Sequence, residues 1–159
     1  MDHVAIMNKK MGLIDKVLDG RKTIESRWYK NRTAPWGKIK KGDTIYFKDS
    51  GGPIRARAEV KKVKFFENIT INIAKEIVNK WGGTGLIDIQ NKKVEEWVKG
   101  KNYCILIWLT KTRKVEKFEI NKNGFGIGAA WITADDIKSL SVSPHLPLMK
   151  GRSTRENKK

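Results

Sequence analysis

GRKTIESR, the segment from Gly20 to Arg27, combines a glycine with four charged residues. Gly20 follows an amphipathic helical pattern over residues 10–19, and glycine commonly ends a helix. Residues 22–28 have the composition of a strand. In an ideal strand Glu25 and Arg27 share one face and Lys22 lies on the other. We expect a bulge or twist after Gly20 to bring Lys22 back toward Glu25, and Glu25 to hold the Arg27 guanidinium flat.

The rest of the chain alternates short strand patterns with a few helical ones. In residues 54–66 apolar positions alternate with charged ones, which is typical of a half-buried strand. The apolar run 103–109 predicts a strand buried on both faces, with 115–120 as its hairpin partner. Further strands are predicted at 3–7 and 44–48, and helices at 10–19, 70–81, 91–99 and 134–140. This order predicts an α+β fold, a mixed β-barrel of about five to six strands with about three to four helices.

The charge of the chain is its most unusual property. It has 34 Lys and Arg against 17 Asp and Glu, a net charge of +17. The excess is concentrated, because the stretch from Arg21 to Lys41 holds eight basic residues and one acidic residue, Glu25, whereas residues 42–60 are neutral overall. A concentrated positive surface suits a phosphate backbone. RNA is therefore the predicted partner, with DNA as an open alternative; a lysine-rich surface that serves only solubility is the plain alternative.

The composition also excludes several kinds of site. Cys104 is the only cysteine, and His3 and His145 are the only histidines, so an intramolecular disulfide and a zinc site of Cys and His ligands cannot form. We predict no metal and no cofactor. Since no apolar run is long enough to span a bilayer, we expect no membrane contact and a cytoplasmic protein, or a nuclear one in a eukaryote. The oligomeric state is open, with a monomer favoured.

A polar loop over residues 30–41 follows the predicted strand. Aromatic side chains that can stack on bases lie here among basic ones that can follow phosphates: Trp28, Tyr29, Lys30, Arg32, Trp36 and Lys38. Trp36, between Pro35 and Gly37, is the better stacking candidate, while Trp28 suits the core equally well. A second basic patch, KKVK at 61–64 with Arg55 and Arg57, is either an outer wall that contacts phosphate or a solvated strand face.

Gly20, Lys22, Glu25 and Arg27 fit the pattern Gly-x-Lys-x-x-Glu-x-Arg. In this pattern, and in the order of its elements, the chain resembles the ASCH domain, a branch of the PUA-like superfamily. The resemblance implies a PUA-like β-barrel, assigned to residues 1–145, with a cleft lined by the signature and a role in RNA binding. Residues 146–159 are predicted to form a basic, flexible tail.

Some ASCH proteins are enzymes, which gives an alternative function. One ASCH-like group hydrolyses the amide of N4-acetylcytidine with a lysine, a threonine nucleophile and a glutamate. The lysine of that group matches Lys22, but Glu25 stands where the threonine would be. Another family member is a ribonuclease. If this chain is a hydrolase acting on RNA or on a modified nucleoside, Lys22 and Glu25 are the predicted catalytic residues.

The favoured hypothesis is an RNA-binding module without catalysis, and a third alternative is an adaptor that binds an acidic protein. The plain alternative for Glu25 and Arg27 is a pair that only stabilises the mouth of the barrel. The glycine-rich stretch 123–128 is expected to form a tight crossing that packs Trp131 near the signature. Under the favoured hypothesis, the residues expected to contact nucleic acid are Lys22, Glu25, Arg27, Trp28, Tyr29, Lys30, Arg32, Trp36, Lys38, Lys48, Arg55 and Arg57.

Overall fold

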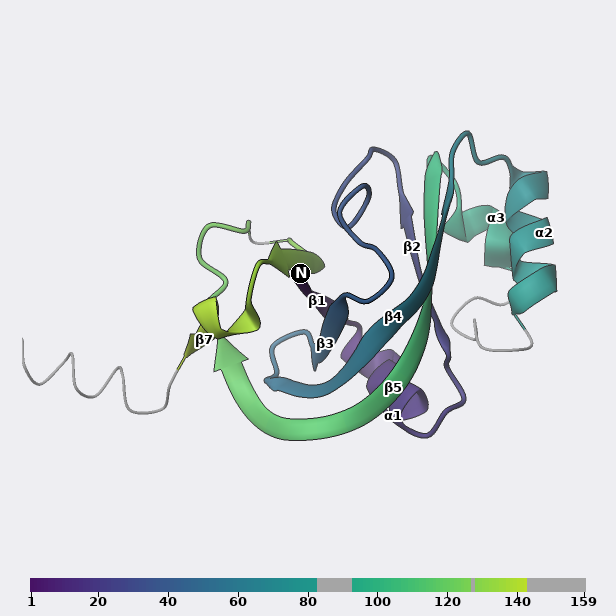
Figure 1. Cartoon of the computed structure of the whole chain (residues 1–159). Helices are drawn as coiled ribbons and strands as arrows, with labels where there is room; N and C mark the ends of the chain where they lie inside the picture. Colours follow the sequence, from purple (N-terminus) through teal and green to yellow (C-terminus); the bar gives the residue numbers. More distant parts are fainter. Residues whose placement is uncertain (83–92, 127, 143–159) are drawn as a thin grey trace, which may run out of the picture.

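The computed structural model describes residues 1–82, 93–126 and 128–142 of the chain (Figure 1). Its helices are α1 (Leu13–Leu18), α2 (Ile71–Trp81) and α3 (Val94–Trp97), and short 3-10 turns lie at Lys9–Met11 and Ile137–Ser139. Its strands are β1 (Asp2–Met7), β2 (Ile24–Tyr29), β3 (Thr44–Asp49), β4 (Ile54–Phe66), β5 (Tyr103–Ile120), β6 (Trp131–Ala134) and β7 (Ser141–Val142).

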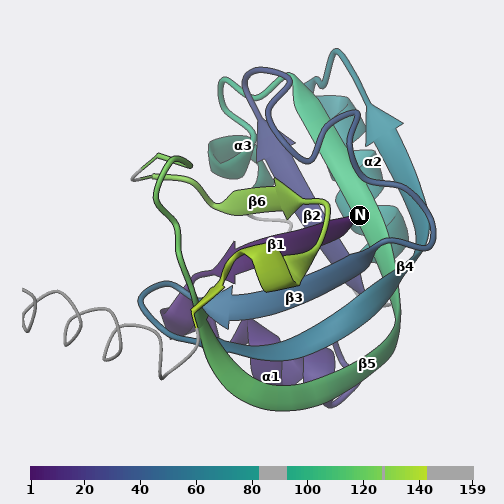
Figure 2. The same cartoon turned by 60° about the vertical axis from the view of Figure 1, so that its left-hand side comes forward.

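The strands form one curled sheet that wraps into a half-barrel (Figure 2). Its order is β2-β5-β4-β3-β1-β6, and β7 adds to the far end of β5. β1 and β3 run parallel, and the other pairs are antiparallel. β2 and β6 are therefore the two edges of the sheet. The predicted α+β class, with about six barrel strands and three helices, is confirmed.

Three apolar clusters of the described residues hold this architecture together, the third of them around Val4, Ile54 and Ile132. The largest fills the concave side of the sheet, where Ile14 of α1 meets Ile45, Phe47, Ile105 and Ile107 of the strands. The second cluster packs α2 and α3 against the other face of β2 and β5. The alternation predicted in β4 is also confirmed, because every second residue from Ile54 to Val60 is buried.

The predicted hairpin between residues 103–109 and 115–120 is wrong. Both segments belong to β5, a single strand of 18 residues that pairs with β4. The residues between them include no glycine, proline or asparagine, the usual turn formers. Instead Lys111 adopts a φ of 52°, and the β4–β5 register shifts three times. Such irregularities bend a strand without reversing it, so β4 and β5 curl together through the molecule (Figure 1).

Two predicted helices are shorter in the structure. Gly12, with a φ of 61°, divides the predicted helix 10–19 into a 3-10 turn and α1. In the predicted helix 134–140, Ala134 completes β6, and the Asp136 side chain caps a single 3-10 turn. The predicted helix 91–99 is α3, with residues 91 and 92 outside the described part. The basic tail predicted at 146–159 also lies outside the described residues.

Across residues 1–82, 93–126 and 128–142, no helix is both long and apolar enough to cross a membrane.

The positive φ of Lys111 makes the bend in β5 sensitive to side-chain shape. A β-branched residue is strongly disfavoured in the left-handed region, so Lys111→Val should lower the free energy of unfolding by roughly 1–2 kcal/mol. Lys111→Gly should not cause this loss, because glycine adopts such angles freely. Urea denaturation measures both variants, and Lys114→Val, in the same strand, is the control. Equal stability of the valine and glycine variants at position 111 would contradict the assignment of the bend to this residue.

Candidate functional site

A row of three charged side chains, Lys22, Glu25 and Arg27, lies at the start of β2, with the first two buried and Arg27 12% exposed. Lys22 has no exposed surface, and its Nζ donates to the Ile24 carbonyl at 2.8 Å and lies 3.2 Å from Glu25 Oε1. Glu25, 2% exposed, accepts through Oε2 from Arg27 Nε at 2.9 Å, and Arg27 Nη2 lies 2.7 Å from the same oxygen. The expected approach of Lys22 to Glu25 and the expected Glu25–Arg27 pair are both confirmed.

Two positive neighbours determine the ionisation of Glu25. Burial by itself would raise the pKa of this carboxyl, but the charges of Lys22 and Arg27 outweigh burial and hold the pKa below its ordinary value. Oε1 accepts no well-aligned hydrogen bond within the described part of the chain, so the Lys22 ammonium is the group that compensates its charge. Glu25 is therefore a fixed counter-ion at neutral pH.

Arg27 joins the two edges of the curled sheet. Its Nη1 donates to the carbonyl of Ala130, directly before β6, at 3.2 Å, and its Nη2 reaches the Ile6 carbonyl of β1 at 3.5 Å. Its guanidinium carbon lies 5.0 Å from the ring centroid of Trp131, so the predicted packing of Trp131 near the signature is confirmed. Within the described residues no backbone ladder connects β2 to β6. The Arg27 side chain forms a hydrogen bond from β2 to the residue before β6, and we call this contact the Arg27 clasp.

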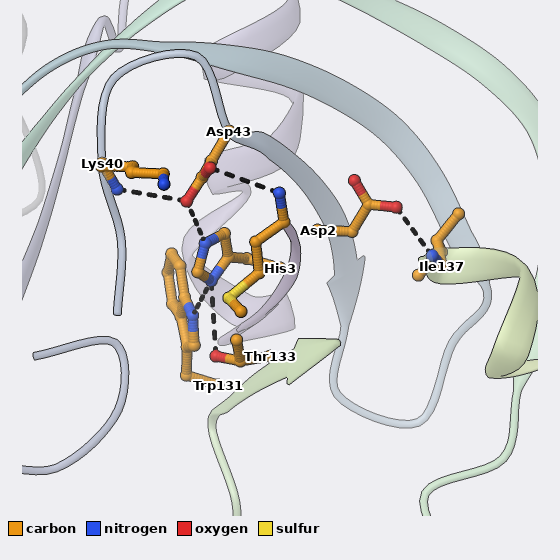
Figure 3. Close-up of polar contacts among 8 residues, drawn as sticks. Asp2, His3, Lys40, Asp43, Trp131, Thr133 and Ile137 are labelled. Carbon is orange, nitrogen blue, oxygen red and sulfur yellow. Dashed lines mark hydrogen bonds and ion pairs between the residues drawn. The ribbon is translucent and has the colours of Figure 1, made fainter. Parts of the chain in front are cut away.

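Trp131, which lies beside Arg27, also contacts a buried histidine, His3. Figure 3 shows the contacts around His3. The Trp131 indole N–H donates to His3 Nδ1 at 3.0 Å, and His3 Nε2 lies 2.9 Å from Asp43 Oδ2. An indole nitrogen can only donate, so Nδ1 is the acceptor, and the hydrogen of neutral His3 is on Nε2, facing Asp43. Burial lowers the pKa of His3, against the opposing effect of Asp43. Protonation at Nδ1 would set two N–H groups against each other.

Two cavities lie beside the Arg27 clasp, and Tyr29 lines both of them. The smaller, of about 270 Å³, lies between the start of the chain and β2, and the larger, of about 530 Å³, between the loop after β2 and the segment that leads into β6. The smaller is lined by Ile6, Met7, Asn8, Met11, Leu13, Glu25, Ser26, Arg27, Trp28, Tyr29 and Trp97. The larger is lined by Tyr29, Thr33, Ala34, Lys38, Gly124, Phe125, Gly128, Ala129, Ala130, Trp131, Ile132 and Thr133.

Several residues predicted to contact nucleic acid are buried, which corrects their assignment. Lys22 has no exposed surface, and Glu25 is only 2% exposed, at the lining of the smaller cavity. Trp28 belongs to the cluster under α2 and α3, and its Nε1 donates to Ser26 Oγ at 3.1 Å. Lys48 is also buried, which lowers its pKa, and nearby Lys122 adds to that effect.

Arg55 and Arg57 lie on β4, away from the signature in the chain, and have partners there. Arg55 forms ion pairs with Asp15 at 3.1 Å and Asp49 at 3.3 Å, and Arg57 stacks over Tyr46 at 5.6 Å. Trp36 packs edge-on against Phe65 and Tyr103, with ring centroids 4.9 and 5.0 Å away. Of the predicted residues, Lys30, Arg32 and Lys38 are exposed.

Sequence reasoning missed Phe125 as a member of the site. It is 37% exposed and lines the larger cavity. The sequence signal for an exposed position was its place in the glycine-rich stretch 123–128, where Phe125 is flanked by Gly124 and Gly126. In the described part of the chain, no group of three or more His, Cys, Asp or Glu side chains is placed to hold a metal ion.

Breaking the buried row should destabilise the fold. Glu25→Gln leaves the Lys22 and Arg27 charges buried without their counter-ion, which should lower the free energy of unfolding by about 3–5 kcal/mol. Urea denaturation measures this loss. Asp19 and Arg21 form an exposed ion pair in the same segment, so Asp19→Asn is the matched control and should change the midpoint little. A Glu25→Gln midpoint close to that of the control would contradict the proposed role of the row.

His3 should make the protein sensitive to mild acid. The pKa of His3 in the folded protein lies below its unfolded value of about 6.5, so near and below that pH the unfolded chain binds more protons than the folded one. The free energy of unfolding is therefore highest above about pH 6.5 and falls as the pH is lowered. Urea midpoints measured from about pH 7.5 to 5 should therefore decline. In His3→Gln, which cannot protonate, this decline should be smaller, while His145→Gln should retain it. If the urea midpoint of His3→Gln declined by the same amount, groups other than His3 would be responsible for the acid sensitivity.

Comparison with known proteins places the fold. No family model and no curated protein matches the sequence. Among solved structures, the chain is similar to the ASCH protein of Zymomonas mobilis, with a TM-score of 0.61, 12% identity and coverage of 89% of this chain and 96% of that one. A tyrosine-to-phenylalanine variant of that protein gives a TM-score of 0.62 at the same identity and covers 99% of that chain. The chain thus has the fold of the ASCH domain, a PUA-like fold, as its Gly-x-Lys-x-x-Glu-x-Arg pattern predicted.

Proposed function

We propose that this chain is an RNA-binding ASCH module that holds a base of single-stranded RNA in its larger cavity. The observation that carries the proposal is the cavity of about 530 Å³, which is lined by three aromatic residues, Tyr29, Phe125 and Trp131, together with Lys38. A volume of this size suits a small aromatic ligand. Aromatic rings that stack on bases, together with cations that meet phosphates, are the usual means by which proteins bind single strands.

The loop after β2 supplies the charge around this cavity. Lys30 and Lys38 are exposed and form no ion pair within the described residues. Arg32 is paired with Glu67 at the surface, where such a pair contributes little and a phosphate can replace the carboxylate. Its guanidinium carbon also lies 5.5 Å from the centroid of Tyr103. These three cations are the proposed phosphate contacts.

In this proposal the signature residue Arg27 holds one wall of the cavity in place. Arg27 lies over Trp131, and Trp131 lines the cavity, so the clasp fixes one wall. A hydrolase is not proposed, because Lys22 has no exposed surface and Glu25, which lines the smaller cavity, is paired with both Lys22 and Arg27. A general acid or base has to come within hydrogen-bond reach of its substrate.

Binding of fluorescently labelled RNA of about 12 nucleotides tests the proposal. Anisotropy titrations from about 50 to 200 mM salt should show an affinity that falls steeply as salt rises. Phe125→Leu should weaken binding by about 1–3 kcal/mol without changing the salt slope, because it removes stacking alone. Lys38→Gln should reduce the slope by about 0.7, as expected for one lost phosphate contact.

Lys117→Gln, an exposed lysine of β5 outside both cavities, is the matched control for Lys38→Gln. The same titrations with DNA of the same sequence measure the preference for RNA. Absence of RNA binding at the lowest salt, or an affinity that salt does not change, would contradict the proposal.

A further inference from the structure

A second groove, here called the lysine groove, lies on the other side of the loop after β2. It has a volume of about 610 Å³ and is lined by Ile39, Lys40, Lys41, Lys61, Lys62, Val63 and Phe65. Lys40 and Lys41 come from the loop, and Lys61 and Lys62 come from β4, so two separate segments place lysines around one depression. The sequence pattern places Lys61 and Lys62 in a basic patch that either contacts phosphate or is a solvated strand face, and it does not include Lys40 and Lys41 among the expected contacts.

The charges of the lysine groove are not compensated by neighbours. No acidic side chain lines it, and its four lysines form no ion pair within the described part of the chain. Elsewhere on β4 the opposite holds, because Arg55 is paired with two aspartates and Glu59 is paired with Lys111. Bringing four like charges together costs free energy that a bound polyanion would recover. The groove therefore favours an anionic ligand.

An aromatic side chain completes the lysine groove. Phe65 is 40% exposed, which is unusual for a large apolar side chain, and it lines the groove. Its ring packs at a steep angle against Trp36, which in turn packs against Tyr103, so neighbours hold it in place. A fixed and exposed ring among lysines suits nucleic acid, whose bases stack, better than an acidic peptide, which offers charge alone.

The lysine groove and the larger cavity share a wall. Thr33, Ala34 and Lys38 line the cavity, and the next three residues, 39–41, line the groove. Three residues of extended chain span at most about 10 Å, so Lys38 and Lys41 lie within that distance of each other along the backbone. A strand of a few nucleotides can therefore reach from one site to the other over the loop.

We infer that the lysine groove binds the sugar-phosphate backbone of the same RNA strand, with Phe65 stacking on one of its bases. The inference rests on the proposed function and adds a second contact region to it. Removing lysines from the groove should therefore change the salt dependence of RNA binding, whereas removing the Phe65 ring should not.

The test uses the full chain and the labelled RNA of about 12 nucleotides described above. Lys61→Gln with Lys62→Gln should reduce the salt slope by about 1.4 and the affinity at about 0.1 M salt by about 25-fold, as expected for two lost phosphate contacts. Lys114→Gln with Lys117→Gln removes the same charge from the exposed surface of β5 and should reproduce little of this effect. Phe65→Leu should weaken binding about fivefold or more with an unchanged slope.

Lys62 lies 4.6 Å from the Trp108 centroid, so the first variant could also affect folding. The variant Lys40→Gln with Lys41→Gln, on the opposite wall of the groove, should have the same effect on binding. It replaces the Lys61→Gln, Lys62→Gln variant if thermal unfolding of the latter differs from that of the unchanged protein. If both pairs bind as the control does while Lys38→Gln and Phe125→Leu weaken binding, the groove inference is wrong and the proposed function stands. If the unchanged protein binds no RNA, both are wrong. Equally tight binding of polyglutamate, lost in the same variants, would assign the groove to an acidic protein.

Discussion

The contact between Arg27 and the opposite edge of the sheet is the constraint on which the rest of this structure depends. In the curled sheet β2 is one edge and β6 the other, and the Arg27 side chain spans the gap between them by donating to the carbonyls of Ala130 and Ile6. The guanidinium can do this because Glu25 holds it in one orientation. Glu25 in turn remains charged inside the protein because Lys22 lies on its other side. Three residues of one short segment thus close the half-barrel.

The clasp also organises what surrounds it. Trp131 packs under the guanidinium, donates to His3 and lines the larger cavity, so the sheet closure, the buried His3–Asp43 pair and the cavity wall share one residue. Burying charges of this kind costs desolvation free energy, so the row contributes little net stability, and its recognised benefit is a defined geometry. The proposed binding surfaces lie outside it, on exposed lysines and aromatic side chains of the loop and of β4. In this proposal the signature residues have a structural role, and recognition belongs to exposed residues of the loop after β2, of β4 and of the stretch around Phe125.

Much of the fold could be predicted from the sequence, because local patterns determine it. The alternation in residues 54–66 identified β4 within its observed bounds. The helix predicted at 70–81 is α2, which Thr70 caps by accepting from the Ile73 N–H at 3.1 Å. The single strand β5 was missed because its bend depends on the backbone of Lys111, a residue type that gives no turn signal. The pairing of Lys22 with Glu25 required knowledge of the family pattern, since ideal pleating places them on opposite faces.

The site was harder to predict because burial is a property of the whole fold. The concentration of charge selected the segment from Arg21 to Lys41 as the predicted binding segment, but composition does not distinguish Lys22, which is enclosed, from Lys38, which is exposed. Trp28 and Trp36 likewise became packing residues once α2, α3 and β4 were in place. Phe65 and Phe125 are distant from this segment in the chain, and only the tertiary structure places them at the lysine groove and the larger cavity.

Native-state amide hydrogen exchange in Arg27→Lys tests the clasp most directly. A lysine keeps the charge beside Glu25 but cannot reach the Ala130 and Ile6 carbonyls together. The account predicts faster exchange at the Ile6 amide, which donates to the Ala130 carbonyl at 3.0 Å, and along the β1–β6 ladder, with amides of the β4–β5 ladder unchanged. Unchanged protection at Ile6, or an equal loss across the whole sheet, would contradict the claim that Arg27 closes the half-barrel.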